Sequence, residues 1–183
     1  MSKKILPIVF VLFNALFLSY LLIPVPPLKD LPNSVKSEEP GDTIQMKNIS
    51  AYYTNLTRTE VINFYRSAYR NPIIIRLNYP PEYAKTIFRD TMQSTYLEEF
   101  SLPFKESLYI NGYEWENDVF TKPEKRIVNK MIYNGAEYKS KVTLKIIPTS
   151  IPLRLLNFFI IEASLIGLFY LYRYFINKNQ NAH

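Results

Sequence analysis

The chain of 183 residues contains no cysteine and a single histidine, His183. Without thiols there are no disulfide bonds and no Cys–His nucleophiles, and with one imidazole a Ser–His–Asp triad or a typical zinc site has few residues to draw on. Only four glycines are present, and they form neither a phosphate-binding loop nor a dinucleotide fingerprint. The sequence therefore predicts no cofactor, no metal and a non-enzymatic role.

A concentrated positive charge is also lacking. The whole chain carries +6, but residues 28–148 contain 17 Lys+Arg and 15 Asp+Glu, which gives this segment a charge of only +2. A nucleic-acid-binding domain would gather its basic residues on one element or face. We therefore expect no nucleic-acid partner.

Long apolar runs, by contrast, are present near both ends. Residues 5–23 carry no charge, and residues 155–171 carry only Glu162. A helix needs about 20 residues, at 1.5 Å each, to cross a hydrocarbon core of roughly 30 Å. We predict transmembrane helices at 5–23 and 152–176, with the lipid bilayer as a partner. The alternative for the first run is a cleaved signal peptide, but no A-x-A-like site follows it.

The short tails indicate how these helices are oriented. Residues 1–4 and 177–183, with the end of the second apolar run, carry basic residues and no acid. The basic residues are Lys3, Lys4, Arg173 and Lys178. By the positive-inside rule, both termini are predicted to be cytoplasmic. The protein would then sit in the plasma (inner) membrane with its central domain outside.

The central segment predicts an α+β fold, with two helices packed on a mostly antiparallel sheet. Residues 24–45 hold five prolines and little periodicity, so they are predicted to be an extended spacer before a domain at 46–148. A capping box at Thr57 and Glu60 begins one helix, and Pro81 begins another. Asn-Gly pairs at 111–112 and 134–135 predict two hairpin turns.

The segment YEWEND, residues 113–118, is the one group of acidic residues that suggests an enzyme. Its members Glu114, Glu116 and Asp118, beside Trp115, could serve hydrolysis of an envelope polymer or bind calcium. On a strand, Glu114 and Glu116 would share one face. A solvated strand face has the same pattern, so these four residues are only a weak candidate surface site.

Glu162 is the most unusual residue of the apolar runs. A charge near the middle of a bilayer costs about 2.5–3.5 kcal/mol, so the carboxyl must be neutral, paired or facing water. Depth along the two helices places Asn14 at a similar level, where its amide could hydrogen-bond the carboxyl. Small residues four positions apart lie beside each of these two residues, a spacing that lets helices approach closely. The predicted helix contact comprises Asn14, Ala15, Ser19, Glu162, Ala163 and Gly167.

These features favour a membrane-anchored scaffold or accessory subunit whose outer domain binds a protein or cell-envelope partner. Glu162 could also face a second subunit, which would make the helices a homo-oligomer contact. A ligand-binding sensor or a small subunit of a transport complex is the first alternative. An envelope-polymer hydrolase is the second.

Overall fold

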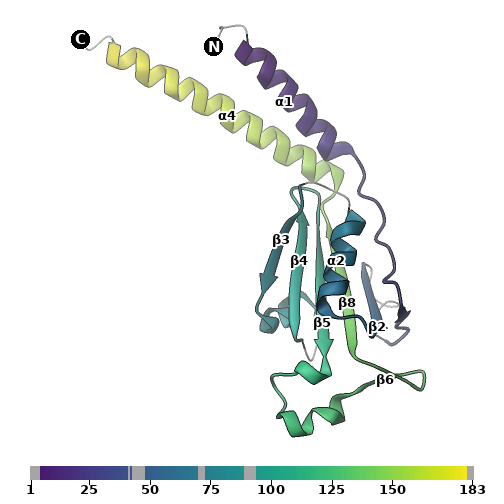
Figure 1. Ribbon diagram of the computed structural model, residues 1–183. Helices are drawn as coiled ribbons and strands as arrows, with labels where there is room; N and C mark the ends of the chain where they lie inside the picture. The colour runs from purple at the N-terminus through teal and green to yellow at the C-terminus, as the bar shows by residue number, and fades with distance from the viewer. Residues whose placement is uncertain (1–4, 41, 43–47, 70–72, 89–93, 181–183) are drawn as a thin grey trace. The chain divides into compact units, whose positions relative to one another are not determined.

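A computed structural model describes residues 5–40, 42, 48–69, 73–88 and 94–180. The predicted tail 1–4 and the last residues, 181–183, lie outside the described part. The chain divides into two compact units, which are Pro26–Pro148 and the terminal segments Met1–Val25 with Thr149–His183. Figure 1 shows both units, with labels on α1, α2, α4, β8 and β2 to β6.

An antiparallel six-stranded sheet forms the frame of the central unit, in the order β1-β2-β8-β5-β4-β3. Every neighbouring pair in this sheet is antiparallel. The α+β class and the antiparallel sheet are therefore confirmed. The strands are β1 (Ser34–Lys36), β2 (Ile49–Thr54), β3 (Ile75–Tyr79), β4 (Tyr96–Leu102), β5 (Glu106–Glu114) and β8 (Ser140–Pro148).

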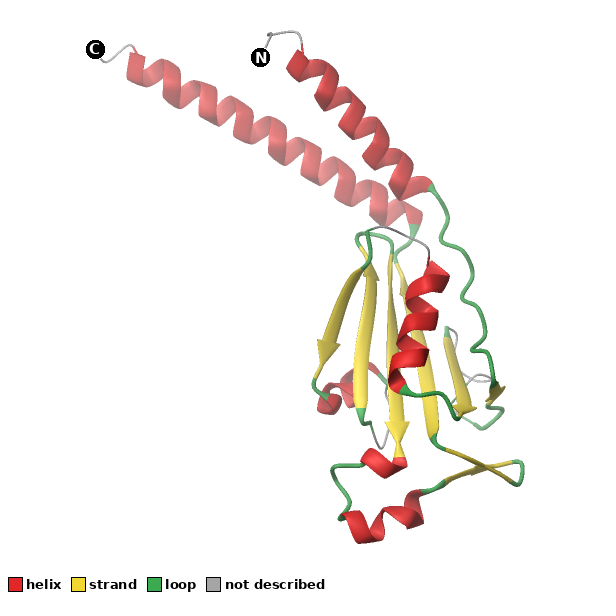
Figure 2. Ribbon diagram, viewed as in Figure 1, coloured by secondary structure: helices red, strands yellow, loops and turns green. Residues whose placement is uncertain are grey.

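Helix α2 (Arg58–Tyr69) covers one face of the sheet, which we call the α2 face (Figure 2). It begins at the predicted capping box: the Thr57 amide donates to Glu60 Oε2 at 2.8 Å, and the Glu60 amide donates to Thr57 Oγ1 at 3.4 Å. Its inward side chains, Val61 and Tyr65 among them, are fully buried. Burying each such side chain contributes about 1.5–3 kcal/mol, so this helix holds much of the core.

The second predicted helix is much shorter than expected. A 3-10 turn at Pro81–Tyr83 runs into α3 (Ala84–Ile87), and residues 89–93 lie outside the described part. Ala84 and Phe88 pack on Leu97, which alternates with Glu98 along β4 and so points to the opposite face, the α3 face. The Lys145 ammonium donates to the carbonyl of Ile87 and closes the end of α3.

The segment expected to be a spacer, 24–45, contributes to the fold. β1 pairs with β2, Leu31 is 4% exposed, and Ser37 is fully buried. The Tyr52 hydroxyl donates to Asp30 Oδ1 at 2.5 Å. Its prolines suggested an open chain, but a three-residue edge strand has too short a pattern to be recognised from sequence. The folded unit accordingly begins at Pro26 rather than near residue 46.

The first predicted hairpin is wrong, because β5 continues without a turn through Asn111 and Gly112. Gly112 lies directly opposite Tyr96, and a Cβ at Gly112 would come within 1.9 Å of the Tyr96 ring. The glycine therefore provides room for a buried ring rather than a turn.

The second predicted turn is confirmed. Asn134 (φ 50°) and Gly135 (φ 77°) both have positive φ, as a type I′ turn requires, and Tyr133 pairs with Ala136. The hairpin is shorter than predicted, however. β6 (Met131–Tyr133) and β7 (Ala136–Tyr138) form their own two-stranded sheet, and β8 then leaves to join β2 and β5.

Two apolar helices make up the other unit, α1 (Ile5–Leu22) and α4 (Ile151–Gln180). Among the described residues, Ile151–Asn177 is the one helical stretch long and apolar enough to cross a membrane, by length and composition only. Of its most apolar window, 6% is buried. The apolar part of α1, Pro7–Leu22, is shorter. By this criterion the predicted span at 152–176 has a candidate helix, and the predicted span at 5–23 does not.

We predict that residues 26–148 unfold cooperatively in urea when expressed alone. Residues 46–148 should be less stable by at least about 2 kcal/mol, because removal of 26–45 exposes the surface that covers Leu31 and breaks the β1–β2 pairing. The comparison requires denaturation curves of both segments, followed by circular dichroism and tryptophan fluorescence. Equal midpoints and slopes would show that the N-terminal strand contributes nothing to stability.

Candidate functional site

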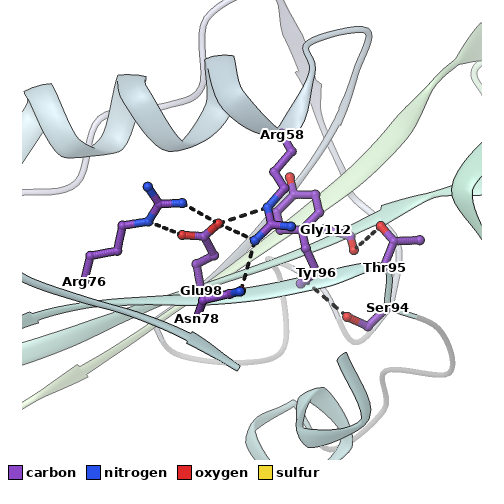
Figure 3. A network of polar contacts seen from close by, with 8 residues as sticks. All are labelled: Arg58, Arg76, Asn78, Ser94, Thr95, Tyr96, Glu98 and Gly112. Atoms are coloured by element: carbon purple, nitrogen blue, oxygen red, sulfur yellow. Dashed lines mark hydrogen bonds and ion pairs between the residues drawn. The ribbon is translucent and has the colours of Figure 1, made fainter. Parts of the chain in front are cut away.

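A buried carboxylate on the α2 face is the centre of a polar cluster, which Figure 3 shows from close by. Glu98 is fully buried and accepts hydrogen bonds from two arginines. Arg58 donates to its Oε1 at 2.7 and 3.0 Å, and Arg76 donates to Oε2 at 2.5 Å and to Oε1 at 2.8 Å. Arg58 also donates to Asn78 Oδ1 at 2.9 Å. We call these four residues the arginine–glutamate cluster.

Three elements bring the cluster together. Arg58 is the first residue of α2, Glu98 lies in β4, and Arg76 and Asn78 lie in the edge strand β3. Asn78 stands directly opposite Glu98 in the β3–β4 register. The Arg58 guanidinium also lies over the Tyr96 ring, 5.1 Å from its centroid. The cluster thus joins the start of the helix to the edge of the sheet.

The electrostatics of the cluster keep Glu98 ionised. Burial by itself would raise the pKa of this carboxyl, but hydrogen bonds from Arg76 and Arg58 outweigh burial and lower it below its ordinary value. Two guanidinium groups share one carboxylate, so the ion group carries a net charge of +1. The side chains of Arg58 and Arg76 are 39% and 46% exposed, which leaves this positive charge accessible from solvent.

Sequence reasoning missed both arginines. Glu98 was not among the predicted site residues either; it and Glu99 are adjacent acids in a strand whose other residues are mostly apolar. Two adjacent acids in such a strand point to opposite faces of the sheet. When both faces are buried, each carboxylate needs its own hydrogen-bond donors, and this pattern could have indicated a polar cluster. Glu99 finds them on the α3 face, where it accepts from the Tyr79 hydroxyl at 2.6 Å and from Ser107 at 2.5 Å.

The predicted acidic surface site is not formed as expected. β5 ends at Glu114 and a 3-10 turn begins at Trp115, so Glu114 and Glu116 do not share a strand face. Asp118 is fully buried, and it accepts from the Phe120 amide at 2.9 Å and from Asn129 at 3.1 Å. Its carboxylate therefore holds a loop together.

The remaining residues of this cluster also make local contacts. Glu114 Oε2 accepts from the Asn117 amide at 2.5 Å, and the Trp115 ring lies 5.8 Å from the Lys130 ammonium. Among the described residues, no group of three or more His, Cys, Asp or Glu side chains is arranged to hold a metal ion.

The second candidate site is the contact between α1 and α4. Arg154, 7% exposed, donates to the Leu21 carbonyl at 3.2 Å and to the Thr149 carbonyl at 2.8 Å. Leu21 belongs to the last turn of α1, whose carbonyls have no partner within the helix. One turn further along each helix, the rings of Phe17 and Phe158 lie 5.7 Å apart.

The predicted pair of Asn14 and Glu162 lies beyond these contacts and stays a prediction. Leu21 and Phe17 are four residues apart, as are Arg154 and Phe158. One further turn of 3.6 residues leads to Phe13 or Asn14 on α1 and to Glu162 on α4. The Asn14 amide nitrogen donates to the Phe10 carbonyl at 3.1 Å. Its Oδ1 is buried without a hydrogen-bond partner among the described residues, and Glu162 is half-buried.

The small residues of the predicted helix contact lie elsewhere on the two helices. Four of the predicted contact residues are exposed: Ala15, Ser19, Ala163 and Gly167. The Ser19 hydroxyl donates to the Ala15 carbonyl at 2.7 Å within its own helix. In the structure, large side chains and Arg154 make the α1–α4 contact instead, since two rings and a guanidinium fill the space between the backbones.

Comparison of the chain with protein-family models, with curated proteins and with solved structures gives no match in any of the three. The two sites therefore rest on their own geometry.

Glu98→Gln should lower the free energy of unfolding by about 3 kcal/mol at pH 7, because it removes the buried charge that both arginines share. Glu82→Gln, at an exposed position of the 3-10 turn, should change it by less than about 0.5 kcal/mol. Urea denaturation of residues 26–148 measures both.

The difference in unfolding free energy between the wild type and Glu98→Gln should depend on pH. The pKa of Glu98 is lower in the folded than in the unfolded state, so its contribution is present above the unfolded value of about 4.3 and is lost as the pH falls through the folded pKa. The stability difference between wild type and Glu98→Gln should therefore shrink in acid. A difference that stays constant from pH 7 to pH 2 would contradict this account.

Proposed function

We propose that the chain is a non-enzymatic, membrane-anchored scaffold or accessory subunit, in which both apolar helices cross the bilayer and residues 26–148 bind a partner outside the cytoplasm. The observation that carries the proposal is the antiparallel α1–α4 contact, in which Arg154 donates to the Leu21 carbonyl and the rings of Phe17 and Phe158 pack one turn further on.

Side-by-side packing supports a membrane position for α1 as well as α4. The 18 residues of α1 extend about 27 Å at 1.5 Å per residue, close to the roughly 30 Å of a hydrocarbon core. Most of its large apolar side chains are exposed, as are those of α4. A bilayer would cover these side chains, and the basic residues Lys3, Lys4, Arg173 and Lys178 favour cytoplasmic termini.

The site chemistry favours a scaffold over the hydrolase alternative. Asp118 is committed to hydrogen bonds that hold its loop, and Glu114 to Asn117. The transport-subunit alternative rests on two observations, the half-buried Glu162 and the buried amide oxygen of Asn14. The behaviour of Glu162 separates that alternative from an assembly role.

The topology can be read from single cysteines in this cysteine-free chain. Positions Ser2, Lys122 and Asn179 sample the two tails and the central unit. A membrane-impermeant maleimide added to intact cells should label only the cysteine at 122, and permeabilised cells should show labelling at all three positions. Labelling at 2 and 179 in intact cells would reverse the topology, and labelling at only one tail would exclude a second span.

For Glu162, we predict that Glu162→Gln preserves the α1–α4 contact and the protein's association with its partners, because a neutral amide can make the same proposed hydrogen bond to Asn14 as a protonated carboxyl. Glu162→Leu should weaken the contact by about 0.6–2 kcal/mol. Asn14→Leu should have the same effect, and the double variant little more. Disulfide formation between cysteines at the neighbouring positions 18 and 157, which leaves the rings of Phe17 and Phe158 in place, reports the contact in membranes.

Ser164→Leu is the matched control, since Ser164 is exposed and its hydroxyl donates within the helix to the Ile160 carbonyl at 2.7 Å. If Glu162→Gln left the disulfide yield unchanged but abolished the cellular phenotype of the gene, an ionisable role in transport would replace the assembly role.

A further inference from the structure

Among the residues that the structure describes, no strand pairs with the outer edge of β3. β3 is the last strand of the six-stranded sheet and is hydrogen-bonded on one side, to β4. Ile75 and Leu77 are 49% and 42% exposed. Proteins usually protect such an edge with lysine, proline or a bulge, because its unpaired N–H and C=O groups attract another strand. β3 has no lysine or proline, and its register with β4 is continuous from Ile75 to Tyr79.

The opposite edge of the sheet looks different. β1 has only three residues, and its Lys36 pairs with Asp30 at 3.3 Å. A strand of three residues offers few backbone groups, and a lysine on it discourages pairing. The contrast makes β3 the edge suited to receive a strand.

Charge determines what kind of strand would fit. The arginine–glutamate cluster carries a net charge of +1 and reaches the edge through Arg76, whose side chain is 46% exposed. A guanidinium has five N–H donors, and among the described residues Arg76 uses two of them, both on Glu98. A carboxylate placed beside Arg76 would balance the charge and accept from the remaining donors, in the geometry that arginine prefers.

We propose that β3 accepts an extended segment of a partner protein that alternates apolar and polar residues and places an aspartate or glutamate beside Arg76. Successive residues of the bound segment would point to opposite faces. On the α3 face, apolar residues would cover Ile75 and Leu77. On the α2 face, the acid would meet Arg76, and a polar residue would meet Asn78. Five paired residues span about 17 Å.

A second copy of the chain fits this edge less well. An antiparallel β3–β3 pair centred on Leu77 would place Asn78 opposite Arg76, with no carboxylate on either side. It would also bring together two clusters that each carry +1. The observed charge therefore favours a different protein as the occupant.

This inference rests on the proposed function in that it names the partner of the scaffold's outer domain. The two remain separable, since strand binding is measured on the purified protein and topology is measured in cells. If labelling reversed the topology, the β3 edge would keep its specificity and would meet a cytoplasmic partner instead.

The test is a selection of random seven-residue peptides displayed on phage, performed on the full chain in lipid nanodiscs. Enriched peptides should alternate apolar residues with polar ones and carry an Asp or Glu between two apolar positions. For the best peptide, binding is measured by fluorescence anisotropy. Replacing its acid with the matching amide should weaken binding by about 5- to 20-fold.

Strand pairing gives a further signature that side-chain contacts alone would not. N-methylation of one alternate set of peptide amides should abolish binding, whereas methylation of the other set should leave it, because only one set faces β3. Leu77→Lys should abolish binding without unfolding the domain, since the side chain is exposed. Val128→Lys, at a position 78% exposed outside β3, should bind normally.

Several results would overturn the proposal. These are a selection without enrichment, enrichment of basic peptides, or binding that persists in Leu77→Lys. A full chain that is dimeric in nanodiscs or detergent, and that Leu77→Lys converts to a monomer, would assign the edge to a second copy instead.

Discussion

Burial of the Glu98 carboxylate is the constraint on which the central unit depends. A charge removed from water must be compensated, and here the compensation comes from the first residue of α2 and from the edge strand β3. The helix must therefore start above β4, and β3 must keep the register that places Arg76 and Asn78 beside the acid. The same contacts that fix the layers leave a positive charge at the margin of the sheet, partly exposed to solvent.

Local interactions were predictable from sequence. Thr57 and Glu60 cap α2 through hydrogen bonds that span three residues, and Asn134–Gly135 adopts a turn whose conformation few other residues tolerate. The Asn111–Gly112 prediction failed because glycine has two uses that look identical in sequence. One is a positive φ, and the other is space for a neighbouring ring, here that of Tyr96.

Interactions between distant parts of the chain were not predictable. Arg58 and Glu98 are 40 residues apart, and Arg76 and Glu98 are 22 apart, so nothing in the local pattern pairs them. β1 was hidden for the same reason, since three residues among prolines become a strand only beside β2. Hydropathy did single out Glu162 as the one charged residue of the apolar runs, but Arg154 was missed because its acceptor is a backbone carbonyl of the other helix.

The place of β8 has a mechanical consequence. β8 pairs with β2 on one side and with β5 along its whole length on the other, and only Thr149 and Ser150 separate it from α4. A tension transmitted through this short connection would act on β8 along its own axis. The hydrogen bonds to β5 would then be loaded together, in shear, and not opened one after another. The sheet would resist such a pull better than a structure in which the tether leaves from an edge strand.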